Sequence, residues 1–295
     1  MEYEGQICRP PMERASFMLA ISVGCAYNRC KFCNLFKHLK YRVLPMEQIE
    51  GELKRVKAAN GNPKQVFLGD GNAFGRKTED LLKILDMIHN YFPACEGVNM
   101  DAAITDISRK TDTELQQLKE AGVSRLYVGI ESGLDDVLIF MDKDHNLEEA
   151  YCQIRRIQSA GLIFNAHIMT GIAGAGRGIE NGIKTAEFFN RTKPERITNF
   201  SLFLDPCTPL YQEIEKGRFI PASELENLKE ERKLLELLET DSLIYDGFHD
   251  YITFRVRGTL PKDREKMLAK LDHAIAQNKE AEKLIAYGNC FSQTA

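Results

Sequence analysis

Three cysteines stand close together near the start of this 295-residue chain. Cys25, Cys30 and Cys33 fall within nine positions, with four and then two residues between them. They follow the apolar run Phe17 to Val23, which predicts a strand, so we expect the cysteines on a loop at its carboxyl end. A loop can wrap around a compact ligand, whereas a strand points alternate side chains to opposite faces. Soft thiolate sulfur in such a cluster is typical of iron–sulfur and zinc sites.

The number of cysteines limits the kinds of metal site that this loop could form. Four ligands would normally complete a cubane cluster or a structural zinc site, but the chain has no fourth cysteine nearby. Three ligands on a four-iron cluster leave one iron open, and an open coordination position is a site for chemistry. The alternatives are a zinc site completed by His38 and a group of three buried thiols, and the residues alone leave both open.

The pattern Gly-Cys-x-x-Asn-x-Cys-x-Phe-Cys resembles the motif of the radical S-adenosylmethionine (SAM) superfamily. The likeness is to its coproporphyrinogen oxidase-like and Elongator-type members, in a Cys-x4-Cys-x2-Cys variant of the usual spacing. It implies a [4Fe–4S] cluster on Cys25, Cys30 and Cys33, whose open iron binds the amino and carboxylate groups of SAM. It further implies reductive cleavage of SAM to a 5′-deoxyadenosyl radical, a flavodoxin- or ferredoxin-type electron donor and an anaerobic, oxygen-sensitive enzyme.

The same resemblance implies cofactor contacts at other predicted strand ends. Phe32 would lie near the adenine, and Gly171 opens an apolar, glycine-containing segment on the adenine side. In Gly69-Asp70-Gly71, glycine lets the backbone approach a ligand and Asp70 offers an acceptor for the methionine ammonium. Glu131 and Ser132 close a further strand, where Glu131 would contact the ribose or methionine part of SAM. From the residues alone, Phe32 could be a core ring, and the segment that Gly171 opens could be a flexible loop. Residues 69–71 could be a plain glycine turn, and Glu131 a helix-capping acid.

Other polar groups are candidates for work on the substrate. Asp101 projects from a predicted strand end, and Cys207 follows the sixth strand, where a thiol could donate a hydrogen atom to a substrate radical or simply be buried. His167 lies inside a strand and is predicted to be a core histidine. Arg255 and Arg257 alternate on a predicted strand, so they share one face and could bind a carboxylate or phosphate, or be solvated. Residues 176–178 could form an anion-binding nest.

Strands and helices alternate between Phe17 and Leu204, which predicts a parallel sheet with crossover helices. The expected strands cover residues 17–23, 65–68, 97–104, 124–130, 162–169 and 196–204, and the expected helices residues 46–59, 78–91, 111–121, 147–160 and 178–190. Six such units are fewer than the eight of a closed barrel. Periodicity alone does not separate an open sheet from a partial barrel. The resemblance implies an α/β fold with a partial (β/α)6 TIM-like barrel of parallel strands.

The domain organisation is predicted from the same pattern. Residues 1–16 form an irregular lead-in, and residues 17–210 form the radical SAM core. Residues 211–295 form a mainly helical α/β extension packed on the barrel, with helices over 222–240 and 261–281 and a strand over 251–256.

Composition limits the function classes. The net charge of −4 gives no electrostatic reason to expect a nucleic-acid partner, and 43% hydrophobic residues are ample for a core. No apolar run approaches the roughly 18–20 residues that span a bilayer, and no apolar signal segment follows Met1, so we expect a cytoplasmic protein. We therefore expect a small-molecule or cofactor-pathway substrate. The alternatives are a radical SAM tRNA-modifying enzyme and a non-catalytic zinc or iron–sulfur protein.

Overall fold

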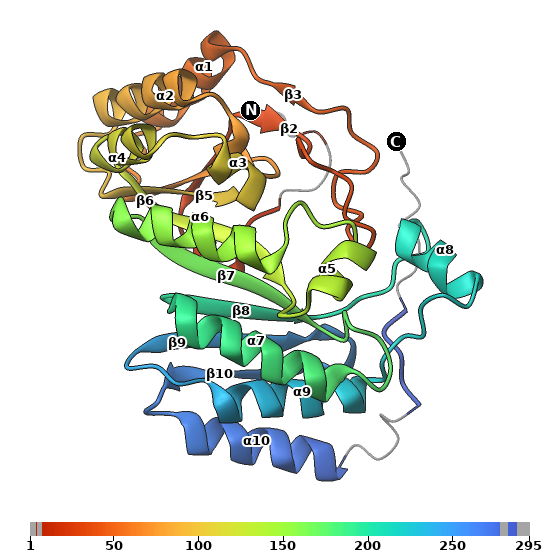
Figure 1. Ribbon diagram of the computed structural model, residues 1–295. Helices are drawn as coiled ribbons and strands as arrows, with labels where there is room; N and C mark the ends of the chain where they lie inside the picture. The colour runs from red at the N-terminus through yellow and green to blue at the C-terminus, as the bar shows by residue number, and fades with distance from the viewer. Residues whose placement is uncertain (1–3, 5–7, 278–282, 288–295) are drawn as a thin grey trace. The chain divides into compact units, whose positions relative to one another are not determined.

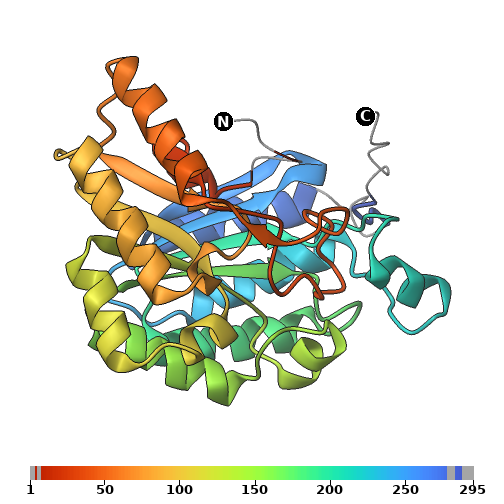
Figure 2. The ribbon, with the colours of Figure 1, turned by 90° about the horizontal axis from the view of Figure 1, so that it is seen from above.

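A computed structural model describes Glu4, residues 8–277 and residues 283–287. The chain divides into two compact units, each of which joins a sheet to helices (Figures 1 and 2). The first unit comprises residues 1–28, 35–128 and 149–164, and the second comprises residues 29–34, 129–148 and 165–295. The cysteine motif crosses from the first unit to the second between Asn28 and Arg29.

The first unit is built on parallel strands in the order β1 (Phe17–Ala20), β4 (Gln65–Gly69), β5 (Gly97–Ala102) and β6 (Val123–Glu131). Its helices are α1 (Met46–Ala58), α2 (Thr78–Tyr91), α3 (Ile104–Ser108), α4 (Asp112–Glu120) and α6 (Leu147–Ser159). Side chains of β4 such as Phe67 are fully buried, as expected of a strand that is covered on both faces. Thr111 and Glu114 form a reciprocal capping box at the start of α4, because each side chain bonds the main-chain N–H of the other.

The second unit carries strands in the order β7 (Ile163–Thr170), β8 (Arg196–Ser201), β9 (Leu243–His249) and β10 (Phe254–Leu260). The pairs β7–β8 and β8–β9 are parallel, and β10 runs antiparallel to β9. The helices α7 (Gly178–Thr192), α9 (Glu224–Leu237) and α10 (Arg264–Gln277) lie together on one face of these strands (Figure 1). Two short helices, α5 (Asp135–Phe140) and α8 (Pro209–Glu215), complete the unit.

The structure confirms the predicted α/β class and the mainly parallel strands. Within the described residues, neither run of strands closes on itself. In the same part of the chain, no helix is both long enough and apolar enough to cross a membrane.

Four predicted strand boundaries are wrong. The strand predicted over 196–204 is β8, which ends at Ser201. The run 17–23 divides into β1 and β2 (Ser22–Val23), because the chain leaves β4 after Ile21 and β2 pairs with β3 (Arg42–Val43) instead. The strand predicted over 97–104 ends at Ala102, because Ile104 already begins α3. The strand predicted over 251–256 begins only at Phe254 and continues to Leu260. Strand β9 was missed, because its Asp246 and Gly247 interrupt a recognisable apolar pattern.

Candidate functional site

The first cysteine is fixed by the turn that follows β4. Cys25 Sγ lies 3.4 Å from Asn72 Oδ1, and the same oxygen accepts the Ala26 N–H at 3.2 Å. Asn72 in turn donates to the carboxylate of Asp106. None of the cysteines in the described residues forms a disulfide, and Cys25 is half-buried. Sequence analysis missed Asn72, although its position directly after Gly69-Asp70-Gly71 was a signal that it belongs to the same turn.

Gly71 brings this turn into direct contact with the cysteine loop. Its φ of +49° lies in the left-handed region, and a Cβ there would stand 2.5 Å from Gly24 O and 2.8 Å from Cys25 Cα. Only glycine allows both the conformation and the approach. A Cβ on Gly69 would meet the methyl carbon of Met18 at 2.6 Å. The two glycines therefore let the turn pack closely, and their predicted contact with SAM stays a prediction.

Asp70 has a carboxylate oxygen with no protein partner. The residue is only 4% exposed, and its main-chain oxygen accepts the Ser22 hydroxyl at 3.1 Å. Among the described residues, nothing hydrogen-bonds its buried Oδ1. Burial raises the pKa of Asp70 to about 6, although the N–H of Gly24 stabilises the carboxylate. A buried acceptor of this kind has room for one strong donor such as an ammonium group.

A buried lysine joins Glu131 to the second cysteine in the second unit. Lys143 Nζ lies 3.3 Å from Glu131 Oε1 and 3.9 Å from Asp144 Oδ1. Burial opposes the charge on Lys143, but Cys30, Glu131 and Asp144 together raise its pKa. Burial raises the pKa of Cys30 to about 11, and Lys143 works against that rise. The lysine thus supplies the positive charge that a buried thiolate and carboxylate need. Sequence analysis missed it, because no periodicity or motif marks it.

The other part of the cysteine loop is anchored on an apolar cluster of the second unit. Lys31 N–H donates to Met141 O at 3.0 Å, and Leu210 N–H donates to Lys31 O at 3.0 Å. Phe32 packs against what we call the apolar cluster: Leu134, Val137, Met141, Ile172, Leu202, Leu204, Leu210 and Phe219. The structure therefore brings together Phe32 and the segment after Gly171, which were both predicted on the adenine side.

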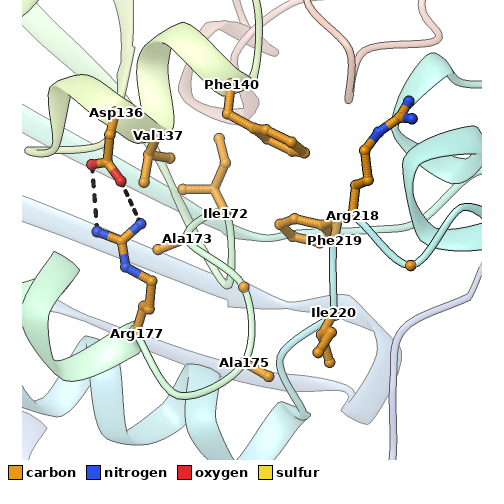
Figure 3. A pocket seen from close by; sticks show the side chains of 12 residues that line it. Asp136, Val137, Phe140, Ile172, Ala173, Ala175, Arg177, Arg218, Phe219 and Ile220 are labelled. Atoms are coloured by element: carbon orange, nitrogen blue, oxygen red, sulfur yellow. Dashed lines mark hydrogen bonds and ion pairs between the residues drawn. The ribbon is translucent and has the colours of Figure 1, made fainter.

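A pocket of about 420 Å³ opens beside this cluster (Figure 3). Its walls come from α5, residues 172–177 and residues 217–220. The rings of Phe140 and Phe219 stack with centroids 5.9 Å apart, and Arg177 bonds Asp136 at 2.6 Å on the opposite side. Flat apolar surface with a charged rim suits a planar group that carries polar edges.

Ser132 and Gly171, two predicted cofactor contacts, bond helices of the second unit. Ser132 is fully buried, and its hydroxyl donates to Asn181 Oδ1 of α7 at 2.6 Å. Gly171 N–H donates to Glu230 of α9 at 2.9 Å, and a Cβ on this glycine would stand 2.6 Å from Asn227 Oδ1. Both residues hold the turns after β6 and β7 in place.

The anion-binding nest suggested for residues 176–178 is not available. The N–H of Gly176 donates to Glu226 Oε1 at 2.7 Å, so a carboxylate of the protein already fills that position. This expectation is corrected for a simple reason. The residue Glu226 lies on α9, about 50 positions after Gly176, so the contact could not be predicted from local sequence.

The two catalytic candidates lie in different units. Asp101 is a half-buried residue of β5, and burial, with Glu13 and Asp70 nearby, raises its pKa to about 8, so it is mostly protonated at neutral pH. Cys207 is exposed in the turn before α8, and its N–H donates to Asp205 Oδ1 at 2.7 Å. Their roles remain predictions.

Comparison with known proteins gives a family for this architecture. The sequence profile of the Radical SAM superfamily matches residues 19–178, more than half of the chain. The heme chaperone HemW of Bacillus subtilis is 26% identical over 231 residues, which cover 75% of this chain and 58% of that protein. The chain thus spans little more than half the length of this relative.

Two solved structures share the fold. Coproporphyrinogen III oxidase (HemN) from Escherichia coli superposes with a TM-score of 0.55 at 13% identity, over 75% of this chain and 50% of that one. Elp3 from Methanocaldococcus infernus gives 0.53 at 16% identity, over 76% and 55%. The expected resemblance to coproporphyrinogen oxidase-like and Elongator-type cores is confirmed, as is the partial-barrel class.

Proposed function

The chain belongs to the radical SAM superfamily, and we propose that it is an enzyme that reductively cleaves S-adenosylmethionine to act on a small-molecule or cofactor-pathway substrate. Members of this superfamily bind a [4Fe–4S] cluster and SAM. One observation carries the proposal: the unpartnered carboxylate oxygen of Asp70 stands in the turn that Gly71 packs against Cys25. It is the acceptor that a SAM ammonium group requires, at the position where the family motif places it.

The residues fit both cofactors. Cys25, Cys30 and Cys33 would ligate the cluster through soft sulfur. Asp70 would accept a hydrogen bond from the methionine ammonium. Glu131, oriented by Lys143, would contact the ribose or the methionine part of SAM. These assignments are proposals that rest on the site geometry and on the family motif.

The cofactors would supply the reactive groups, and the protein would position them and exclude water. When bound, the reduced cluster supplies the electron that cleaves SAM to methionine and a 5′-deoxyadenosyl radical. Lys143 balances buried negative charge beside Cys30 and Glu131. Phe32 and the apolar cluster would hold the adenine and exclude water around it. A flavodoxin- or ferredoxin-type protein is the proposed electron donor.

Anaerobic reconstitution with iron and sulfide tests this function. We expect a four-iron EPR signal after reduction, a change in that signal on adding SAM, and formation of 5′-deoxyadenosine. Cys30→Ala should abolish all three, whereas Cys152→Ala, an exposed cysteine outside the motif, should leave them intact. A Cys30→Ala protein that still forms 5′-deoxyadenosine contradicts the assignment, and tightly bound zinc without iron favours the non-catalytic alternative.

A heme-binding chaperone is the second candidate. It is favoured by the HemW relative, which aligns with 75% of this chain. Titration of the reconstituted protein with hemin, followed by absorption spectroscopy, separates the two. Saturable hemin binding without SAM cleavage favours the chaperone, and SAM cleavage without hemin binding favours the enzyme.

A further inference from the structure

One face of the second-unit sheet is turned away from α9. The side chains of Tyr245 and His249 on β9 both bond Glu231 of α9, at 2.8 and 2.9 Å. Because side chains alternate along a strand, Asp246 and Phe248 must lie on the opposite face. The register of the neighbouring strands extends this face across the sheet.

Two rows of directly opposed residues make up the face. The first row runs Met169, Phe200, Phe248 and Arg255, across β7, β8, β9 and β10. The second row, one strand period away, runs His167, Thr198, Asp246 and Arg257. Directly opposed residues point to the same side of a sheet and contact one another. We call Phe200, Phe248, Arg255 and Arg257 the Phe–Arg face.

The first row forms a continuous stack. The rings of Phe200 and Phe248 lie 5.4 Å apart at 26°, and Arg255 Cζ stands 3.9 Å from the centroid of Phe248. Arg255 is exposed, so the outer side of its planar guanidinium is open to a further flat group. Guanidinium planes stack on π systems on either side, which makes this row a platform for a conjugated ring.

The face carries uncompensated positive charge. Its carboxylate, Asp246, is paired with Arg196 of β8. Among the described residues, neither Arg255 nor Arg257 makes an ion pair, and both are exposed. Half-buried His167 has its pKa lowered to about 4 by desolvation and by Lys143, so it adds no charge at neutral pH. Two arginines on one face, two residues apart, are suited to bind a carboxylate or phosphate.

The Phe–Arg face also lies where a ligand of this sheet would bind. Phe200 and Phe248 each precede the last residue of their strand, at the carboxyl end where ligands of α/β folds bind. Met169, at the other end of the first row, packs against the apolar cluster that includes Phe32 as a neighbour. In addition, the fully buried Thr198 Oγ1 has no hydrogen-bond partner within the described part of the chain.

We propose that the Phe–Arg face binds the substrate, and that this substrate is a flat conjugated ring carrying a carboxylate or phosphate. The ring stacks on the outer side of the Arg255 guanidinium, whose inner side rests on Phe248, and the acidic group bonds the N–H groups of Arg255 and Arg257. The assignment of this ligand as substrate rests on the proposed function, but the binding chemistry does not. A porphyrin carboxylate and a flavin or nucleotide phosphate share this chemistry, so the test includes both.

Equilibrium dialysis of the anaerobically reconstituted protein tests the face with three probes. Protoporphyrin IX carries carboxylates, FMN carries a phosphate, and riboflavin has the flavin ring of FMN without the phosphate. We expect saturable binding of protoporphyrin IX, of FMN or of both, with riboflavin binding at least tenfold more weakly than FMN where FMN binds. The stronger of the anionic probes identifies the acidic group.

Variants locate the site. Arg255→Gln and Arg257→Gln should each weaken the anionic probe roughly 10- to 100-fold, the loss expected for a hydrogen bond to a charged group. Arg232→Gln, an arginine on α9 and therefore on the covered side of the sheet, should leave its affinity unchanged. Failure of both anionic probes to bind, or unchanged affinity in the Arg255→Gln/Arg257→Gln double variant, overturns the proposal.

Failure of the proposed ligand site can be distinguished from failure of the proposed function. The double variant should retain the iron content of the parent and its SAM-dependent EPR change. Conversely, Cys30→Ala should lose the cluster and still bind the anionic probe. Probe binding with no SAM turnover in the parent would refute the enzyme and keep the ligand site.

Discussion

Asp70 and Glu231 are both buried carboxylates, yet they stand in opposite situations. Glu231 on α9 is fully buried and saturated: Oε1 accepts from Tyr245 and Asn199 at 2.8 and 2.9 Å, and Oε2 faces His249 Nε2 at 2.9 Å. Asp70 is 4% exposed and keeps Oδ1 without a partner among the described residues. The first arrangement stabilises the fold, whereas the second leaves a buried acceptor unsatisfied, which costs free energy.

The two carboxylates also differ in the charge around them. His249 next to Glu231 has its pKa raised to about 9, because Glu231 and Glu224 outweigh the effect of burial. No described cation offsets the burial of Asp70, and its pKa rises to about 6. Complete pairing is expected of a structural group, and the unpaired acceptor beside the cysteine motif is what our proposal for Asp70 requires.

The largest effect is expected from Glu231→Ala. It removes one of the two carboxylates that pair with buried His249 and the acceptor of Tyr245 and Asn199, so the free energy of unfolding should fall by about 3–5 kcal/mol. Urea denaturation measures this loss. Glu236→Ala, on the exposed side of the same helix, serves as the control and should have little effect. A small effect of Glu231→Ala would mean that pairing there is not structural.

Gly71→Ala should damage the site beside Asp70. The added Cβ would meet Gly24 O at 2.5 Å and Cys25 Cα at 2.8 Å, so the turn and the cysteine loop must separate. We expect iron bound per chain after reconstitution to fall to less than half. Gly176→Ala is the matched control: it has a similar left-handed φ of +78°, but no atom lies within 4 Å of its Cβ. Equal iron loss in both variants would attribute the effect to backbone strain alone.

Asp70→Asn should separate the effect on SAM binding from the effect on the stability of the fold. Removing the charged acceptor should weaken SAM binding by about 2 kcal/mol, roughly 30-fold, as measured by anaerobic calorimetry on the reconstituted protein. The same change removes a buried, incompletely paired charge, so unfolding should require no less urea than in the parent. A variant that unfolds more easily and still binds SAM normally would reverse the roles assigned here.

A further expected effect is on the pH dependence of stability. Asp101 has its pKa raised from 3.8 to about 8, so the folded state holds a proton that the unfolded state loses above about pH 4. Stability from this group therefore falls as pH rises from about 4 to 8. Asp101→Asn should flatten the decline, which urea denaturation at pH 5 and pH 8 would detect. An unchanged slope would show that Asp101 does not titrate as its burial requires.

Sequence analysis was most successful where interactions are local. The bounds of α2 at Thr78 and Tyr91 were predicted from periodicity. The three cysteines indicate the family because the thiols expected to ligate one cluster all lie within one short loop. Where partners are remote in sequence, the predictions were incomplete. Ser132 and Gly171 were assigned to a cofactor, but they contact α7 and α9 through Asn181 and Glu230.

The alternation of strands and helices and the cysteine motif could be predicted from the sequence, since both depend on neighbours a few positions away. The sequence also supplied the candidate residues at the strand ends. The tertiary structure alone decided which of those residues have partners. Lys143 reaches Glu131 from the segment after α5, Asn72 meets Cys25 across 47 positions, and Arg255 stacks on Phe248 through strand pairing. Burial and pairing are set by packing between distant segments, and those properties separate the saturated carboxylate of Glu231 from the unsatisfied one of Asp70.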